Sequence, residues 1–290
     1  MRLPVPSTFS VAAVDRVTGD VGVAVQSKFL SVGAMVPWVR AGVGAVATQA
    51  FANTSYGPRG LDLLAAGTAP DDVAAALVAD DDGRDDRQFG IVDMRGRAAT
   101  YTGSRCIGYA GGIAGDGFAA QGNCLASAAV VDALASTFAS SRGHLADRLV
   151  AALRAAQRHG GDKRGQQSAA LIIERPGGGY AGFNARAVDL RVDDHAEPIE
   201  ELARLLEMHK LYFFAAEPND VLTIDDALGR EIAGELVRAG ALDAGGPFDD
   251  RVRGALVSFM HVENLENRVR DDRTIDRQTV DYLRNFQRSG

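Results

Sequence analysis

The residues most able to do chemistry are small hydroxyl and basic side chains in a hairpin near the start of the chain. Residues 8–15 and 21–29 are rich in β-forming residues and flank a short turn that contains Gly and Asp. Thr8 opens the first of these predicted strands, and Ser27 and Lys28 end the second. Because the strands of a hairpin pair antiparallel, we expect the three side chains to lie close together.

This arrangement suits nucleophilic catalysis by a threonine. A hydroxyl becomes a nucleophile when a base and a positive field lie beside it, and a chain-terminal threonine supplies the base through its own α-amine. Seven residues, Met1–Ser7, precede Thr8. Either they are removed, or the true start of the chain differs, or the site uses another mechanism in which a group such as Ser27 does the chemistry. The alternative is structural, since Thr and Ser are common in strands and Lys28 is then a solvated strand end.

The composition favours a small-molecule substrate over a polyanionic partner. The chain has 290 residues, a formal net charge of −7 and a sequence pI of about 5.3. Nucleic acids and anionic membranes select a basic face, so we expect neither as a partner. No apolar run is long enough to span a bilayer, and residues 1–7 lack the apolar core of a signal peptide. These features predict a cytoplasmic protein.

The motifs predict neither a cofactor nor a metal. The glycine motifs that bind phosphate or dinucleotides are absent, as is the Gly-x-Ser-x-Gly motif of α/β-hydrolases. Asp193 and His195 can share one strand face, but a metal normally needs three or more ligands. A pair of His195 with a carboxylate that orders a loop is the preferred interpretation. Cys106 and Cys124 are interpreted as small buried hydrophobes.

The order of predicted elements is typical of an α+β fold with layered sheets. Hairpins alternate with pairs of helices, whereas a doubly wound parallel fold alternates single strands and helices. We therefore expect two facing antiparallel sheets with helices on opposite outer sides. The expected strands are 8–15, 21–29, 35–50, 89–93, 98–103, 117–123, 168–174, 179–183 and 188–192, and the expected helices are 58–66, one opening at Pro70, 126–139, 145–159 and 198–211.

A smaller helical part follows a polar, proline-containing boundary. Its apolar spacing predicts three helices, at 224–239, 248–260 and 275–286. The expected division is one domain over residues 1–214 and a second over residues 219–290, and we expect the first to fold without the second.

Six sequence blocks in order give the chain a resemblance to a known family. They are Gly-Val-Ala-Val-Gln-Ser-Lys-Phe (22–29), Val-Gly-Ala-Val-Ala-Thr-Gln-Ala (43–50), Ser-Tyr-Gly-Pro-Arg-Gly-Leu (55–61), Gln-Gly-Asn (121–123), Gly-Asp-Lys-Arg-Gly-Gln-Gln-Ser-Ala (161–169) and Val-Asp-Leu-Arg-Val-Asp-Asp-His (188–195). Through them the chain resembles the bacterial and archaeal family called domain of unknown function 1028, which is placed in the N-terminal-nucleophile (Ntn) hydrolase superfamily. The resemblance implies a four-layer αββα sandwich and identifies no substrate.

Carried over position by position, the resemblance also implies a site. Thr8 takes the place of the superfamily's nucleophile, with Ser27 and Lys28 as the polar groups beside it. An ammonium there would lower the pKa of a neighbouring amine or hydroxyl. Gln49 ends the third strand, where this fold commonly supplies a backbone donor for an oxyanion, and its side-chain amide is a further donor.

Two more residues complete the predicted set, and both have structural alternatives. Asn123 ends a strand together with Gln121, and it either faces the same cleft or belongs to a simple turn. Asp162 lies where many superfamily members hold an acid that organises the nucleophile's amine, but an ion pair with Arg164 would instead brace the turn. Asn53, which follows the third strand, is equally well explained as a helix cap.

The C-terminal part resembles a small three-helix peptidoglycan-binding-like domain that some members of the family carry. The match covers residues 231–242 and 248–259. Without a secretion signal, a docking or oligomerisation module is an equal alternative. We expect a homo-oligomer.

Two functions from different classes remain. The first is an Ntn-type hydrolase that cleaves a small amide or ureide bond with an N-terminal threonine. The alternative is a noncatalytic Ntn-fold protein that binds a small metabolite or a partner. The polar blocks favour the first, and the residues before Thr8 favour the second. Intact mass separates them, because loss of Met1–Ser7 supports the enzyme.

Overall fold

The computed structural model describes residues 8–287. Contacts divide the chain into two compact units, with unit 1 ending at Leu206 and unit 2 beginning at Glu207. The sequence analysis placed the end of the first domain later, at residue 214, whereas the contacts place it at Leu206. The reason is that the last turn of helix α5 (Pro198–Phe213) is held by a buried guanidinium of unit 2, that of Arg268, which donates to backbone carbonyls there.

Six strands form the larger sheet of unit 1, in the order β10-β9-β2-β1-β8-β7. Every neighbouring pair is antiparallel. The β1–β2 hairpin lies at the centre of the sheet, with Thr8 directly opposite Ser27. The strands are β1 (Thr8–Asp15), β2 (Asp20–Ser27), β7 (Tyr109–Gly115), β8 (Phe118–Leu125), β9 (Ser168–Glu174) and β10 (Arg186–Val192).

Four antiparallel strands form a second sheet, in the order β3-β4-β5-β6. They are β3 (Pro37–Arg40), β4 (Gly44–Ala50), β5 (Arg87–Asp93) and β6 (Ala98–Thr102). Successive side chains of a strand point to opposite faces, so alternate residues of each strand are buried between the sheets. The apolar side chains packed there include Val21, Val23, Val25, Ala45, Ala47 and Val92.

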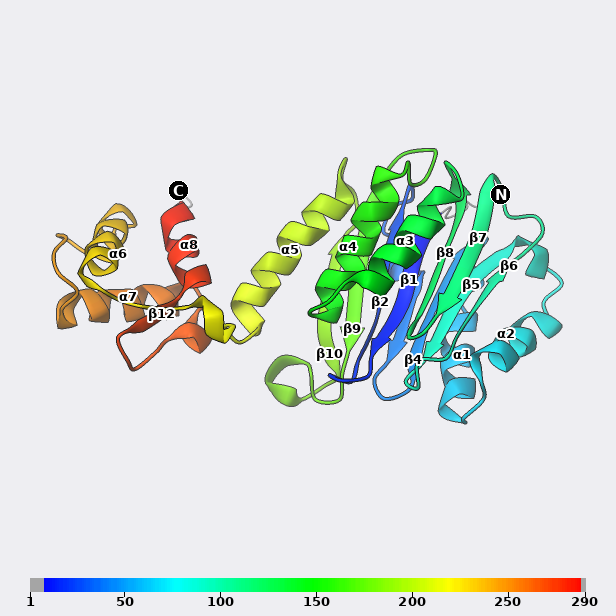
Figure 1. Cartoon of the computed structure of the whole chain (residues 1–290), viewed down its shortest axis with the longest axis horizontal. Helices are drawn as coiled ribbons and strands as arrows, with labels where there is room; N and C mark the ends of the chain where they lie inside the picture. Colours follow the sequence, from blue (N-terminus) through cyan, green and yellow to red (C-terminus); the bar gives the residue numbers. More distant parts are fainter. Residues whose placement is uncertain (1–7, 288–290) are drawn as a thin grey trace. The chain divides into compact units, whose positions relative to one another are not determined.

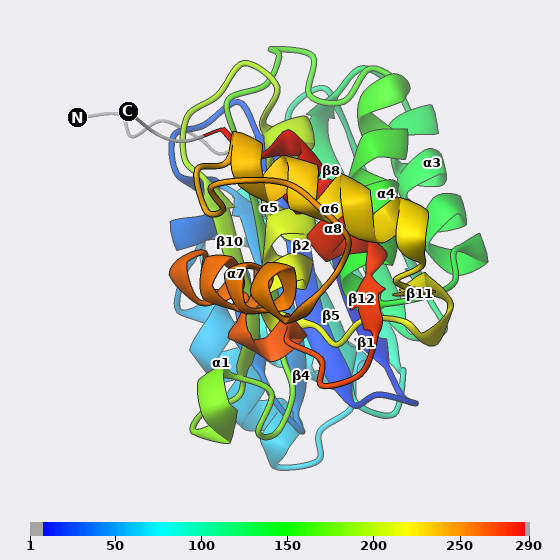
Figure 2. The same ribbon diagram turned by 90° about the vertical axis from the view of Figure 1, so that its left-hand side faces the viewer.

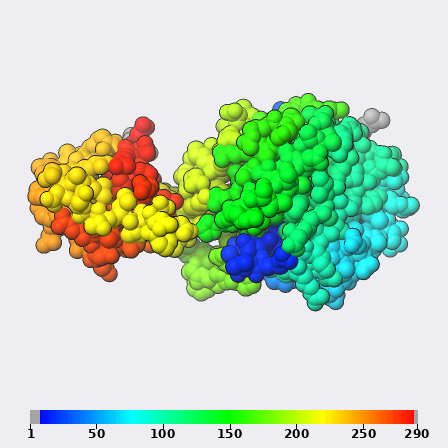
Figure 3. Space-filling view, in the orientation of Figure 1, coloured from blue at the N-terminus to red at the C-terminus, as the bar shows by residue number. Residues whose placement is uncertain are grey.

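Helices cover the outer face of each sheet (Figure 1). Helices α3 (Ala129–Ser140) and α4 (Leu145–Arg158) lie against β1, β2, β7 and β8, and they form much of the surface of unit 1 seen in Figure 3. Helices α1 (Tyr56–Ala65) and α2 (Pro70–Ala79) lie against the smaller sheet. Their apolar side chains pack on the other alternate residues of that sheet, among them Val46, Phe89 and Ile91.

Unit 2 is mainly helical (Figure 2). It contains β11 (Val221–Thr223), α6 (Asp226–Arg238), α7 (Asp250–Val262), β12 (Thr274–Asp276) and α8 (Arg277–Asn285). Each of its three complete helices begins after an aspartate whose carboxylate accepts backbone N–H bonds, which stabilises the helix start. Among residues 8–287, no helix combines the length and the apolar character needed to cross a membrane.

The structure corrects three details of the sequence analysis. Residues 179–183 do not form a strand: Tyr180–Gly182 is a short 3-10 turn, and β9 pairs with β10 instead. Strand β7 was not expected, because its glycines hide the β pattern. The expected strand at 35–50 is two strands, β3 and β4, joined by a tight turn in which Gly42 has φ +73°.

Candidate functional site

The predicted site residues lie at one end of the sandwich, where β1 begins and β2, β4 and β8 end. Antiparallel pairing brings these strand ends together: Thr8 lies opposite Ser27, and Phe9 lies opposite Gly122. Strand β5 begins at the same end, because Gln49 pairs with Gln88. The inward-facing positions near this end are polar, whereas those further along the strands are apolar.

The Thr8 hydroxyl lies against the Ser27 hydroxyl. Thr8 Oγ1 donates to Ser27 Oγ at 3.1 Å, and both residues are fully buried. The Thr8 carbonyl accepts a 3.2 Å bond from Nε2 of Gln49, which comes from the opposite sheet. The first residue of β1 is therefore fixed through its side chain by its own sheet and through its backbone by the facing sheet.

Gln88 connects the two sheets behind this pair. Its Oε1 accepts from Gln49 Nε2 at 2.8 Å and from Asn123 Nδ2 at 2.9 Å. Its Nε2 donates to the Gly122 carbonyl at 2.8 Å and to Thr102 Oγ1 at 3.0 Å. A buried amide with its donors and acceptor all used rigidifies its surroundings, because every alternative arrangement leaves a polar group unpaired.

A second chain of bonds lies deeper between the sheets. Ser10 Oγ donates to Gln49 Oε1 at 2.6 Å and accepts from Gln121 Nε2 at 2.7 Å. The side-chain oxygen of Gln121, Oε1, is buried and has no hydrogen-bond partner among the described residues.

Asp162 fixes the end of β2. One of its oxygens accepts from the backbone N–H of Lys28 at 3.3 Å, and its carboxylate forms a 2.7 Å ion pair with Arg164. The carboxylate is fully buried, and the backbone of Asp162 bridges to Leu125 of β8. Asp162 thus joins the ends of β2 and β8 and anchors the segment that leads into β9.

Lys28 is the exposed member of the predicted set. Its ammonium donates to the Gln166 carbonyl at 3.3 Å. The ammonium is therefore directed toward the segment before β9, while its backbone holds Asp162. At the end of this segment, the hydroxyl of Ser168, the first residue of β9, donates a 2.5 Å hydrogen bond to the Phe29 carbonyl.

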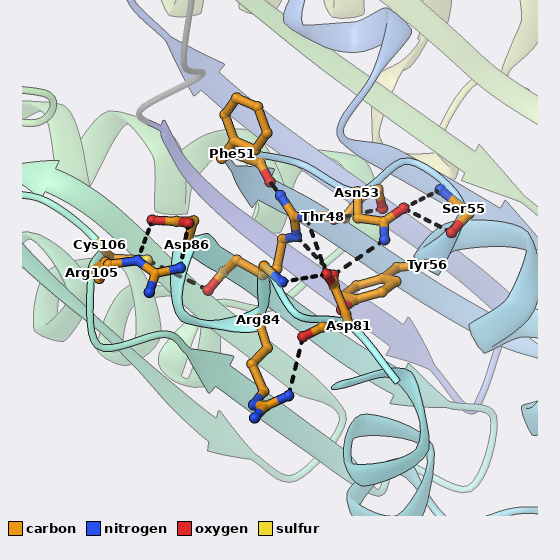
Figure 4. Close-up of polar contacts among 12 residues, drawn as sticks. Thr48, Phe51, Asn53, Ser55, Tyr56, Asp81, Arg84, Asp86, Arg105 and Cys106 are labelled. Atoms are coloured by element: carbon orange, nitrogen blue, oxygen red, sulfur yellow. Dashed lines mark hydrogen bonds and ion pairs between the residues drawn. The ribbon is translucent and has the colours of Figure 1, made fainter. Parts of the chain in front are cut away.

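A cluster around Asp81 holds the loop that follows β4 (Figure 4). The Asp81 carboxylate accepts from Tyr56 Oη at 2.6 Å, from Asn53 Nδ2 at 3.3 Å and from Arg87 Nε at 2.8 Å. Arg87 also donates to the Phe51 carbonyl at 2.5 Å, and its guanidinium lies over the Phe51 ring. The cluster therefore fixes the backbone beside Gln49.

The electrostatics of this cluster suit positioning rather than proton transfer. The hydrogen bond from Arg87 holds the pKa of Asp81 well below its usual range. Burial, reinforced by the Asp81 charge, raises the pKa of Tyr56 well above its usual value. Near neutral pH the carboxylate keeps its charge and the phenol keeps its proton, so neither is matched to acid–base catalysis at that pH.

Two residues beside the polar chain have left-handed backbone conformations without being glycine. Ala50, at the end of β4, has φ +63°, and Cys124, near the end of β8, has φ +53°. Such conformations cost on the order of 1–3 kcal/mol each and persist where the surrounding structure enforces them. They occur directly after Gln49 and Asn123, so the backbone beside both of these candidate site residues is held in a strained conformation.

Comparison with known proteins places the chain in a family. The family model described as a family of unknown function, DUF1028, matches residues 8–202, which is more than half of the chain. The chain belongs to the DUF1028 family. A crystal structure of a family member from Silicibacter pomeroyi is 32% identical to it, with a TM-score of 0.66, and the match covers 72% of this chain and 88% of that one. No curated protein matches the chain in sequence.

A second family model matches the C-terminal part. It is described as a peptidoglycan binding domain and covers residues 212–283, which lie within unit 2. Both family resemblances inferred from the sequence blocks are thereby confirmed. The DUF1028 match begins at Thr8, the first residue of β1.

In this DUF1028 protein, the six predicted site residues form one connected set. Hydrogen bonds lead from Asp162 through the backbone of Lys28 to the β2 end, from Ser27 to Thr8, and from there through Gln49 and Gln88 to Asn123. Their catalytic roles stay a prediction. The removal of Met1–Ser7 concerns residues outside those that the structure describes.

The structure shows the contacts of three residues for which the sequence left a structural role open: Asp162, Asn53 and His195. The ion pair of Asp162 with Arg164 is present. Asn53 stabilises the turn before α1, because its side-chain oxygen accepts from the backbone N–H of Ser55. His195 Nδ1 accepts from the backbone N–H of Glu197, so its loop is ordered by a backbone bond. Within residues 8–287, no three His, Cys, Asp or Glu side chains gather closely enough to hold a metal ion.

The sequence analysis missed Gln88. It is the residue that links the two sheets, yet the expected strand began one residue later, at residue 89. The available signal was alternation: Gln88 shares a strand face with Gly90 and Val92, which face the other sheet. A glutamine on a buried face needs polar partners, and these are Gln49 and Asn123.

Proposed function

We propose that this DUF1028 protein is an Ntn-type hydrolase that cleaves a small amide bond once Thr8 is the first residue of the chain. The observation that carries the proposal is the fixation of Thr8. Its hydroxyl bonds to Ser27 and its carbonyl bonds to Gln49, at the strand end where the family match begins. The layered arrangement of sheets and helices supports assignment to the Ntn fold.

The chemistry needs one base and one donor for the developing charge. The Thr8 α-amine takes the hydroxyl proton, Thr8 Oγ1 attacks the amide carbon, and the leaving amine departs with that proton. A water molecule then hydrolyses the acyl ester, which restores the hydroxyl and releases the acid. Ser27 holds the hydroxyl in position for the first of these steps.

Asn123 is the better candidate for the oxyanion donor, and Gln49 is a positioning residue. Both hydrogens of the Gln49 amide are used, one by the Thr8 carbonyl and one by Gln88. Asn123 donates one hydrogen to Gln88, and its second has no acceptor among the described residues. A preorganised donor of this kind typically contributes about 10²–10³ in kcat.

The test compares three proteins in a screen of small amides. They are the full chain, a chain that begins with Thr8, and the same shortened chain with Thr8→Ala, each verified by intact mass. We expect turnover only from the chain that begins with Thr8. Thr18→Ala in the shortened chain is the matched control, because Thr18 lies in the β1–β2 turn at the other end of the hairpin. Turnover by the Thr8→Ala protein, or by the full chain, equal to that of the chain that begins with Thr8 would refute the proposal.

One observation favours the noncatalytic alternative. Thr8 and Gln49 are fully buried in the chain that includes residues 1–7, so this form gives a substrate no direct path to the hydroxyl. If purified protein keeps Met1–Ser7 and the chain beginning with Thr8 turns over no amide, the protein is a binding protein on this fold.

A further inference from the structure

Four large apolar side chains are exposed around the candidate site. They follow or precede the strands that end there: Leu30 comes after β2, Phe51 after β4, and Ile107 and Tyr109 flank the start of β7. Their exposed fractions are 57%, 42%, 56% and 41% respectively. Large apolar residues grouped at one functional end of a protein indicate a binding surface rather than random exposure.

Hydrogen bonds connect the segments of two of these four residues, Ile107 and Phe51, and we call the four residues together the rim. The carbonyl of Ile107 accepts from the backbone N–H of Cys124, the residue after Asn123. Cys106 Sγ lies 3.5 Å from the carbonyl of Arg87, and Arg87 in turn holds the Phe51 carbonyl.

Two lysines lie on the same rim. The backbone of Lys163 bonds to the Cys124 carbonyl, and its Nζ would lie 3.1 Å from a Cβ built on Gly108, so the ammonium lies against the segment between Ile107 and Tyr109. Lys28 lies two residues before Leu30, and its ammonium donates to the carbonyl of Gln166, three residues after Lys163. Neither lysine forms an ion pair with any of residues 8–287.

The neighbouring arginines differ from these lysines, because their charges are already paired. Arg164 pairs with Asp162, Arg105 with Asp85 and Asp86, and Arg87 with Asp81. The rim therefore offers apolar surface together with two cationic groups that form no ion pair within residues 8–287.

We propose that this rim binds an amide with an apolar acyl chain and a carboxylate, the chemical class of N-acyl amino acids. The apolar side chains Leu30, Phe51, Ile107 and Tyr109 contact the acyl chain, and Lys28 and Lys163 bind the carboxylate. The inference rests on the proposed function, because it names the substrate class of the same site.

The test is direct binding to the full chain, in which the six rim residues are exposed or partly so. Isothermal titration calorimetry is performed with N-octanoylglycine, with N-acetylglycine, which lacks the long chain, and with N-octanoylglycinamide, which lacks the carboxylate. We expect N-octanoylglycine to bind at least about tenfold more tightly than either comparison compound. Its affinity should fall as salt is added, because the ion pair is exposed.

Variants identify the surface. Lys163→Gln should weaken N-octanoylglycine binding about fivefold and leave N-octanoylglycinamide binding unchanged. Ile107→Ser should weaken both octanoyl compounds. Arg95→Gln and Val17→Ser are the matched controls, since both side chains are exposed in turns at the other end of the sandwich, and neither should change binding.

The outcomes separate this inference from the hydrolase proposal. Equal binding of N-octanoylglycine and N-acetylglycine, or no effect of Lys163→Gln, would overturn the ligand class even if the Thr8-first chain hydrolyses other amides. The expected binding pattern without any turnover by that chain would uphold the ligand class and refute the hydrolase.

Discussion

Replacing Gln88 by methionine should destabilise unit 1 strongly, and the size of the effect follows from its bonds. Methionine keeps most of the side-chain volume and removes the amide. Three buried groups then lose a partner: the amides of Gln49 and Asn123 and the carbonyl of Gly122. Each such group costs about 1–3 kcal/mol, so we expect the free energy of unfolding to fall by about 3–9 kcal/mol.

Urea denaturation followed by tryptophan fluorescence measures this loss in the right unit. The sequence contains one tryptophan, Trp38, and it lies in β3 of unit 1. Thr102→Val is the control, because it removes one acceptor of Gln88 Nε2 while the Gly122 carbonyl remains. Its expected cost is about 1 kcal/mol.

Comparing the stability losses of Gln88→Met and Thr102→Val tests whether the hydrogen bonds of Gln88 hold the candidate site in place. If Gln88→Met costs no more than Thr102→Val, the polar chain between the sheets does not hold the site, and the positioning argument for Thr8 and Asn123 is wrong. If the cost is several-fold larger, the same variant of the Thr8-first chain should also lose turnover.

Three further outcomes are expected. Because the pKa of Asp81 is lowered in the folded state, its charged carboxylate stabilises the fold at any pH above the ordinary aspartate pKa of about 4. The difference in unfolding free energy between wild type and Asp81→Asn should therefore be full at pH 7 and shrink as the pH falls below about 4. A difference that does not depend on pH contradicts this. Arg268→Met leaves the buried carboxylate of Asp276 without its partner and should destabilise unit 2 by about 3–5 kcal/mol, measured by calorimetry; unchanged melting of unit 2 counts against the pair. A chain ending at Phe214 should keep a cooperative thermal transition, and an insoluble or molten product would refute independent folding of unit 1.

Much of the fold was predictable because its pattern is local. The alternating Val residues of the β1–β2 hairpin and the helical spacing of α4 mark their elements without reference to the rest of the chain. Strand β7 could not be found this way, since Gly111 and Gly112 lower its β propensity, and it forms because it pairs with β8. Residues 179–183 look like a strand, but the left-handed Ala181 interrupts them.

The sequence predicted which residues group at the candidate site, but it did not predict the hydrogen bonds that connect them. Thr8, Ser27 and Asn123 were found because strand ends of a known family meet there. Gln88 depends on a contact between two sheets, which a single sequence does not reveal. The direction of the Lys28 ammonium is likewise set by the Gln166 carbonyl, a partner far along the chain.

The most direct test of the central claim is where a β-lactone, an electrophile that acylates nucleophilic hydroxyls, attaches to the Thr8-first chain. Peptide mass mapping of the labelled protein locates the adduct. The account predicts one stoichiometric adduct on Thr8. The full chain should form no such adduct, because its Thr8 nitrogen belongs to the peptide bond with Ser7 and cannot act as a base. An adduct on another residue, or equal labelling of Thr8 in the full chain, would contradict it.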